Sequence, residues 1–173
     1  EVFEQWEIPL AKVLRRSPRI LLRKAQEMMQ LLAFLQDETI GPGMSHSQVQ
    51  EVASSFPMLL LATRRPEEQL GPLVAFLRSL GVAPNATKAL QFYAWPNAAE
   101  MLRETAKFLE DRGYTRAQLQ ENVDLLGYSF DARIFPRSRF LDKLGLKSKD
   151  CPLQILAAAE DKRFCQTLGV KLE

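Results

Sequence analysis

Apolar residues recur along the chain with the spacing of an amphipathic helix. Between residues 70 and 80 they stand at positions i, i+3, i+4, i+7 and i+10, on one stripe of a helix formed by Leu70, Leu73, Val74, Leu77 and Leu80. No alternation of apolar and polar residues reaches the length of a strand. The pattern therefore predicts an all-α fold.

The same helix returns along the chain as an internal repeat with a period of 32 residues. Its marker is the pattern Phe-Leu-x-x-x-Gly, which begins at Phe76, Phe108 and Phe140. An earlier copy begins at Phe34, with a longer connection over residues 36–43. The equivalent positions around the pair are Leu70, Leu102 and Ile134 before it, and Gly81, Gly113 and Gly145 after it.

Each repeat is predicted to contain two helices. The glycine suits the left-handed residue that closes the first helix. A polar residue then starts the second one: Ser45 with Gln48 and Thr115 with Gln118 form capping boxes, and Asn85 is a further candidate cap. The second helices are expected over residues 47–55, 85–93, 116–124 and 151–159.

We interpret the chain as a single domain over residues 1–173. Its expected units are 17–55, 56–91, 92–123 and 124–160, with 161–173 as a C-terminal cap. Pro18 and Pro57 lie at unit starts, where proline ends one helix and begins the next, whereas Phe92 and Asp124 stand at the later starts. One helix pair cannot bury its apolar stripe alone, so the pairs are expected to stack into a curved solenoid.

The net charge of +2 is small, but the basic residues are unevenly distributed. A first basic cluster comprises Arg15, Arg16, Arg19, Arg23 and Lys24, within a stretch that has no acidic residue. A second basic cluster comprises Arg133, Arg137, Arg139, Lys143, Lys147 and Lys149. Residues 100–124 between them carry six acids and four bases. Each cluster is either a solvated helix face or a contact surface for a polyanion.

Sequence motifs of catalysis and of cofactor binding are missing, so we expect neither an enzyme nor a cofactor. No phosphate-binding glycine loop and no nucleophile elbow occurs. His46 is the one histidine, and the spacing of Cys151 and Cys165 does not match a zinc site. The two cysteines are expected to be reduced apolar residues. No apolar stretch approaches the roughly 20 residues of a membrane span.

The segment 127–137 reads Gly-Tyr-Ser-Phe-Asp-Ala-Arg-Ile-Phe-Pro-Arg, and the Phe-Leu-x-x-x-Gly pattern of Phe140 follows it. It closely resembles the C-terminal hallmark of the mTERF (mitochondrial transcription termination factor) family, with Phe130 in place of the usual leucine. Residues 17–22 and 55–81 are similar to the family's repeats, and the resemblance spans roughly residues 17–170. It implies a solenoid of about four two-helix repeats that binds double-stranded DNA or RNA in mitochondria or chloroplasts.

The resemblance and the two basic clusters together suggest an organellar protein that binds structured, ribosomal RNA, in ribosome assembly or as a ribosome component. The eleven residues of both clusters are the candidate contacts, although Arg133 and Arg137 lie inside the hallmark and are also candidates for pairing within the fold. We expect RNA rather than DNA, ribosomal or other organellar proteins as further partners, no membrane, and a mitochondrial or alternatively chloroplast location.

Two other functions remain open at this stage. The first is binding of double-stranded DNA in transcription termination, for which Tyr93, Tyr114 and Arg112 would have to contact unstacked bases. The second is a scaffold that clasps a partner protein, which the acidic middle of the chain and its low net charge favour.

Overall fold

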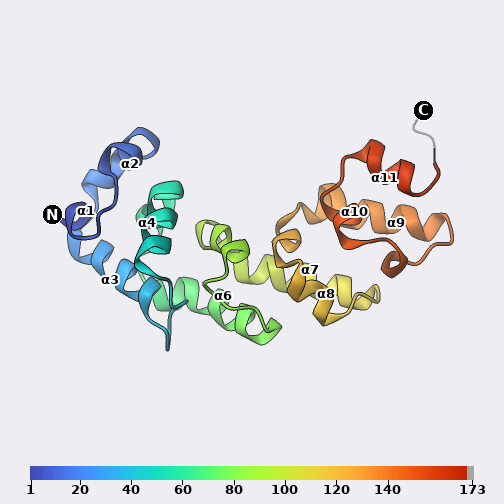
Figure 1. Cartoon of the computed structure of the whole chain (residues 1–173), viewed down its shortest axis with the longest axis horizontal. Helices are drawn as coiled ribbons and strands as arrows, with labels where there is room; N and C mark the ends of the chain where they lie inside the picture. The colour runs from blue at the N-terminus through green and yellow to red at the C-terminus, as the bar shows by residue number, and fades with distance from the viewer. Residues whose placement is uncertain (171–173) are drawn as a thin grey trace. The chain divides into compact units, whose positions relative to one another are not determined.

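The computed structural model of the chain describes residues 1–170. All regular elements in these residues are helices and none is a strand, which confirms the all-α prediction (Figure 1). Contacts divide the chain into two compact units, residues 1–99 and residues 100 onward, and each is described by itself. The single repeat domain stays a prediction, and residues 171–173 of the expected cap lie outside the described residues.

The first unit is built from helices joined by short turns. Pro18, Pro57 and Pro66 each stand in the first turn of their helix, where the missing N–H costs no hydrogen bond. In chain order the elements are α1 (Val2–Gln5), α2 (Leu10–Arg16), the 3₁₀ helix η1 (Pro18–Leu22), α3 (Ala25–Gln36), α4 (His46–Ser55), α5 (Pro57–Ala62), α6 (Pro66–Leu80) and the 3₁₀ helix η2 (Thr87–Ala94).

The second unit has the same character, with shorter helices after its first one. Helix α7 begins at the end of the first unit and continues into the second. The elements are α7 (Ala98–Asp111), α8 (Arg116–Glu121), the 3₁₀ helix η3 (Val123–Gly127), the π-helical turn η4 (Phe130–Ile134), α9 (Phe135–Lys143), the 3₁₀ helix η5 (Ser148–Asp150), α10 (Leu153–Ala157) and α11 (Asp161–Thr167).

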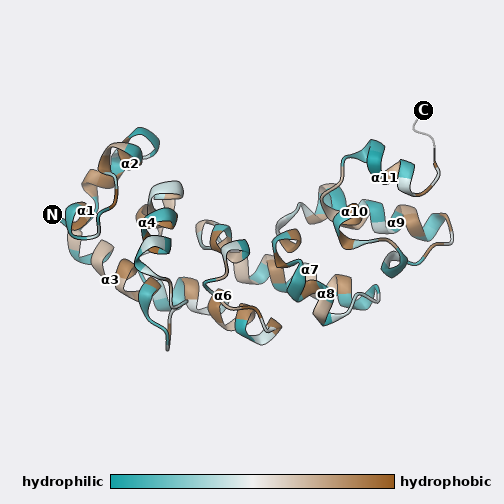
Figure 2. Cartoon of the chain, in the orientation of Figure 1, coloured by the Kyte–Doolittle hydropathy of each residue, from teal (hydrophilic) through white to brown (hydrophobic). Residues whose placement is uncertain are grey.

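The predicted apolar stripe of residues 70–80 is the buried face of α6. All five stripe residues are buried, and apolar and polar residues alternate along the helix as a stripe requires (Figure 2). The equivalent positions of the three copies, Leu77, Leu109 and Leu141, each have 0% exposed surface. The repeat therefore marks the interior of both units.

The predicted helix ends recur with one geometry. Gly81, Gly113 and Gly145 all have positive φ, of 82°, 91° and 70°. After each glycine, the next N–H donates to the carbonyl five residues earlier, at 2.9 Å, 3.0 Å and 2.9 Å. This pair of features is the Schellman closure of a helix, in which the left-handed residue turns the chain without a Cβ clash. The same closure occurs three times at the repeat period.

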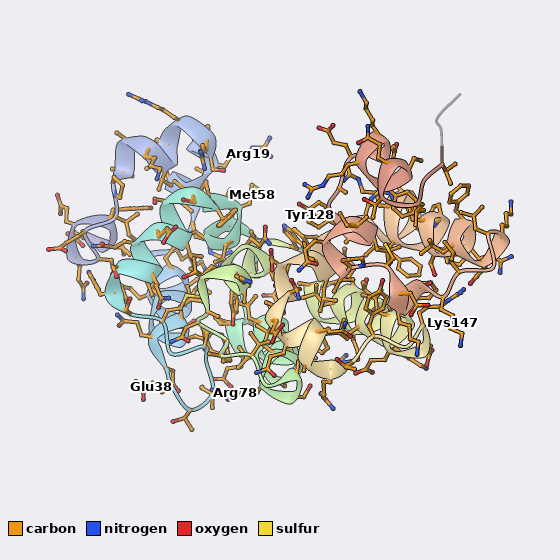
Figure 3. All side chains as sticks on the ribbon, turned by 45° about the vertical axis from the view of Figure 1, so that its right-hand side comes forward. Arg19, Glu38, Met58, Arg78, Tyr128 and Lys147 are labelled. Carbon is orange, nitrogen blue, oxygen red and sulfur yellow. The ribbon has the colours of Figure 1, made fainter. Side chains whose placement is uncertain are left out.

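The earlier, looser copy closes its helix in a related way. Met44 follows Gly43 and donates from its N–H to the Leu35 carbonyl at 2.8 Å, across the whole longer connection. The side chain of Arg78, on α6, holds that connection in place at 2.8–2.9 Å by donating to the carbonyls of Glu38, Thr39 and Gly41. Figure 3 labels Glu38 and Arg78 on the same side of the first unit. The longer connection is thus a fixed loop.

The second helices of the four copies differ in how they begin. Both predicted capping boxes are present, with Ser45 accepting from the Gln48 N–H at 3.2 Å and Thr115 from the Gln118 N–H at 3.3 Å. The helices that follow, α4 and α8, are α-helices. In the other two copies no side chain caps the second helix, which is the 3₁₀ helix η2 in one and the five-residue α10, preceded by η5, in the other.

Three expected second helices are corrected by the structure. The helix expected over 85–93 is η2, whose N-cap residue is Ala86; Asn85 does not cap it, and its amide group donates to the Gly43 carbonyl at 2.8 Å. The helix expected over 116–124 ends at Glu121, after which the chain tightens into η3. The helix expected over 151–159 shortens to α10, which begins after Pro152.

We expect Gly145→Ala to lower the free energy of unfolding by about 1 kcal/mol, because a Cβ at a left-handed residue crowds the following carbonyl oxygen. No other atom lies within 4 Å of the added Cβ, so backbone strain alone is tested. Gly145→Asn should cost less, since asparagine tolerates this conformation. Urea denaturation compares the three proteins, and equal stabilities would contradict the left-handed closure.

Candidate nucleic-acid interface

The first basic cluster lies on α2, η1 and the turn into α3. The side chains of Arg15, Arg19 and Lys24 are exposed and have no hydrogen bond or ion pair with any described residue. Arg16 is exposed too, but its guanidinium donates to the Ser55 carbonyl at the end of α4, at 2.5 Å. Three of the five predicted residues are therefore free to contact a ligand, and Arg16 is partly committed.

Arg23 is not a candidate contact for nucleic acid. Its side chain is only 5% exposed, and its Nε lies 3.0 Å from a Glu27 carboxylate oxygen. Its two terminal nitrogens donate to the carbonyls of Leu61, at 2.7 Å, and of Thr63, at the C-terminal end of α5. The sequence prediction for this residue is corrected, because its guanidinium joins α5 to the start of α3.

The second basic cluster is divided between surface and interior. Arg139 and Lys143 stand one helical turn apart on α9, and Lys147 and Lys149 follow in the connection and in η5. All four are exposed, and none of their side chains forms a hydrogen bond or an ion pair within residues 1–170. The one acidic residue among them on α9, Asp142, is paired with Arg112 at 2.6 Å. These four side chains are exposed positive charges on the second unit, and Asp142 and Asp150 are the acidic residues within residues 139–150.

Arg137 is buried, and of its two predicted roles the structure shows the pairing within the fold. One of its terminal nitrogens donates to the carbonyls of Ile155 and Leu156, at 3.2 Å and 2.9 Å. The other donates to the Ala159 carbonyl and to the Asp161 carboxylate, both at 2.7 Å. Its guanidinium also lies 4.9 Å from the ring centre of Phe164. All four acceptors of its guanidinium are groups of the protein itself, so Arg137 is not a candidate contact for nucleic acid.

Arg133, the other arginine of the hallmark, is half-buried. It donates to the Ala158 carbonyl at 3.3 Å, and its guanidinium lies 5.8 Å from the centre of the Tyr128 ring. Both hallmark arginines thus reach the carbonyls at the C-terminal end of α10, where no intrahelical donor exists. The hallmark of residues 127–137 therefore works chiefly as a clamp on α10.

The pairing of Arg137 with Asp161 also sets the acidity of that carboxyl group. The hydrogen bond from Arg137 favours the ionised form and so holds the pKa of Asp161 below its usual value. The arginine is buried while the aspartate is exposed, at 7% and 81% of the side-chain surface. The ion pair therefore joins a buried guanidinium to a carboxylate at the surface of the second unit.

The three residues considered for contact with unstacked bases are committed to the fold. The Tyr114 hydroxyl is buried and donates to the carbonyls of Ser148 and Cys151 at 2.6 Å and 2.7 Å. The Tyr93 hydroxyl donates to Pro84 at 3.0 Å, and burial raises the pKa of both phenols. Arg112 donates to both oxygens of Asp142, at 2.7 Å and 2.6 Å. These residues do not present free groups to a nucleobase.

Sequence reasoning missed an exposed apolar surface beside the first basic cluster. Leu21 and Leu22 on η1 are 66% and 86% exposed, and Met58 on α5 is 57% exposed. One signal was present in the sequence: three consecutive apolar residues, from Ile20 to Leu22, cannot all lie on one face of a helix. Only Ile20 is buried.

Comparisons with protein-family models, with curated proteins and with solved structures found no match to this chain. The resemblance to the mTERF family therefore stays an expectation from the residues that carry it. Within the described residues no helix is both long and apolar enough to cross a membrane. In the same part of the chain, no three His, Cys, Asp or Glu side chains gather as a metal site, and both cysteines are buried free thiols.

We expect Arg137→Lys to lower the free energy of unfolding by about 2 kcal/mol or more. A lysine ammonium cannot replace the planar guanidinium at four acceptors, so buried carbonyls lose their donors. Arg139→Lys, two residues away on α9 but exposed, is the matched control and should change stability by less than about 0.5 kcal/mol. Urea denaturation followed by circular dichroism measures both, and equal losses would refute the clamp.

The Asp161 carboxylate should make stability depend on pH in the acidic range. Because the folded-state pKa of Asp161 is lowered, its contribution is complete above the unfolded value of about 4 and is lost as pH falls through the folded value. Below pH ~4 the wild type should therefore lose stability more steeply than Asp161→Asn. Denaturation midpoints from neutral to acidic pH test this, and parallel curves would exclude it.

Proposed function

We propose that this chain is an organellar RNA-binding protein of the mTERF type, which binds structured, ribosomal RNA in ribosome assembly or as a ribosome component. The observation that carries the proposal is the surface formed by Arg139, Lys143, Lys147 and Lys149. The mitochondrion is the proposed location, with the chloroplast as the alternative.

The chemistry of this surface suits phosphate. Three of its four charges are lysine ammonium groups, which are compact, strongly hydrated point charges without a directional preference. Such groups contact phosphates of any sequence, and RNA of defined shape is recognised largely through phosphates and 2′-hydroxyls. With Asp142 neutralised by Arg112, Asp150 beside Lys149 is the one acidic side chain left to offset them within residues 139–150.

The repeat supports the proposed solenoid architecture. The buried leucine and the left-handed glycine recur with the same closure at residues 77–82, 109–114 and 141–146. Equivalent units with equivalent interiors are what a stacked helical array requires, since each unit covers the apolar face of its neighbour. We propose that the pairs stack in this way, as the family resemblance implies.

Transcription termination on double-stranded DNA receives less support. It would need aromatic or arginine side chains free to hold unstacked bases. Tyr93 and Tyr114 are buried with their hydroxyls bonded to carbonyls, and Arg112 is paired with Asp142. RNA binding through exposed cations requires none of these groups.

RNA affinity should depend on the four exposed cations. Fluorescence anisotropy with the full chain and a folded fragment of organellar ribosomal RNA should show an affinity that falls steeply with salt, because bound cations release counterions. Lys143→Glu with Lys147→Glu should weaken binding by about tenfold or more and make the salt dependence shallower.

The matched control is Lys107→Glu with Lys162→Glu, which changes the net charge equally at exposed positions on α7 and α11. It should retain most of the affinity. Binding that is insensitive to salt, or an equal loss in both double variants, would contradict the assignment of this surface to RNA.

A further inference from the structure

A groove runs between η1 and α5 in the first unit, with a volume of about 500 Å³. Pro18 and Arg19 line it from η1, and Met58, Leu61 and Ala62 line it from α5. The α5 residues stand at i, i+3 and i+4 and so share one helix face. Figure 3 labels Arg19 and Met58 on the same side of this unit. The groove is apolar along α5 and basic along η1.

Two exposed leucines on η1, Leu21 and Leu22, follow the two η1 residues that line this groove. A 3₁₀ helix has three residues per turn, so residues at i and i+3 lie above one another. Leu21 therefore continues the face of Pro18, and Leu22 continues the face of Arg19. Leu22 is 86% exposed, the largest value among the exposed large apolar side chains of the chain's described part. Adjacent solvent-exposed leucines are costly unless something covers them.

The groove is held in shape by contacts beneath it. Arg23 donates to the Leu61 carbonyl, which fixes the C-terminal end of α5 against the residue that follows η1. At the other end, Arg16 bonds the Ser55 carbonyl and Ser17 Oγ lies 3.6 Å from Met58 Sδ. A preformed site loses little conformational freedom when a ligand binds.

The rim of the groove is positively charged. Arg15 and Arg19 are exposed without a partner in the described residues, and Lys24 lies just beyond η1. No acidic residue occurs between Lys12 and Lys24, and Glu27, the first one after it, is paired with Arg23. An occupant must therefore combine an apolar ridge with negative charge on its flanks.

We propose that this groove binds an acidic amphipathic helix of a partner protein. Leucine-rich helices dock into apolar grooves through residues at i, i+3, i+4 and i+7, and acidic residues beside them would face Arg15 and Arg19. RNA fits less well because apolar side chains form the wall along α5, whereas RNA of defined shape is recognised largely through phosphates and 2′-hydroxyls. A membrane fits less well because its surface cannot enter a concave site. The groove uses residues other than those assigned to RNA in the second unit.

A synthetic peptide of about 18 residues tests the proposal, with leucines at i, i+3, i+4 and i+7 and glutamates elsewhere. Fluorescence anisotropy with the full chain should show saturable binding. Leu22→Ser and Arg19→Glu should each weaken it, Leu22→Ser by about tenfold, as expected for the loss of one buried leucine. A peptide with lysines in place of the glutamates should not bind.

Leu146→Ser is the matched control, because Leu146 is 42% exposed and belongs to the second unit, whereas the groove is lined by residues of the first. It should leave peptide binding unchanged. Equal effects of Leu22→Ser and Leu146→Ser would overturn the proposal. The proposal would also be overturned if Leu22→Ser still bound the peptide but no longer bound vesicles of phosphatidylcholine and phosphatidylserine, or no longer bound the RNA fragment. If the proposal holds, Leu22→Ser leaves the RNA affinity intact, so failure of the peptide-binding proposal can be distinguished from failure of the RNA-binding proposal.

Discussion

Carbonyl groups at the ends of short helices are the constraint on which this fold depends. The last four carbonyls of a helix have no intrahelical donor, and α5 and α10, with six and five residues, consist largely of such ends. Arg23 bonds the carbonyls that end α5, and Arg137 bonds those that end α10. Leaving these acceptors unpaired in the interior would cost more than each hydrogen bond contributes on average. The arginines therefore decide which short helices pack together.

Local features of this fold could be predicted because their causes lie within a few residues. The stripe of α6 follows from spacing alone, and the glycines after the repeat's Phe-Leu pair close their helices as expected. Ser45 and Thr115 form capping boxes with residues three positions away. Where no such residue stands, the helix expected over 85–93 is a 3₁₀ helix, and the helix expected over 151–159 shortens to the five residues of α10.

Long-range features escaped prediction because their causes lie far along the chain. Arg23 reads as a surface cation in the sequence, and Arg137 as either a surface cation or a partner within the fold. Their carbonyl and carboxylate acceptors lie 38–40 and 18–24 residues away. Asn85 looked like a cap, but its amide partner, the carbonyl of Gly43, is 42 residues distant. In the candidate site, Lys143, Lys147 and Lys149 are exposed as expected, while the exposure of the leucines of η1 was not predicted.

The two kinds of basic residue are consequently divided between two tasks. Every lysine in residues 1–170 is exposed, whereas the deeply buried cations, Arg23 and Arg137, are arginines. Acylation of amines removes positive charge from lysine and leaves guanidinium groups intact. An acetylating environment would therefore strip much of the charge from the surface of the second unit without loosening a single helix end. Surface charge and folding are chemically separable in this chain.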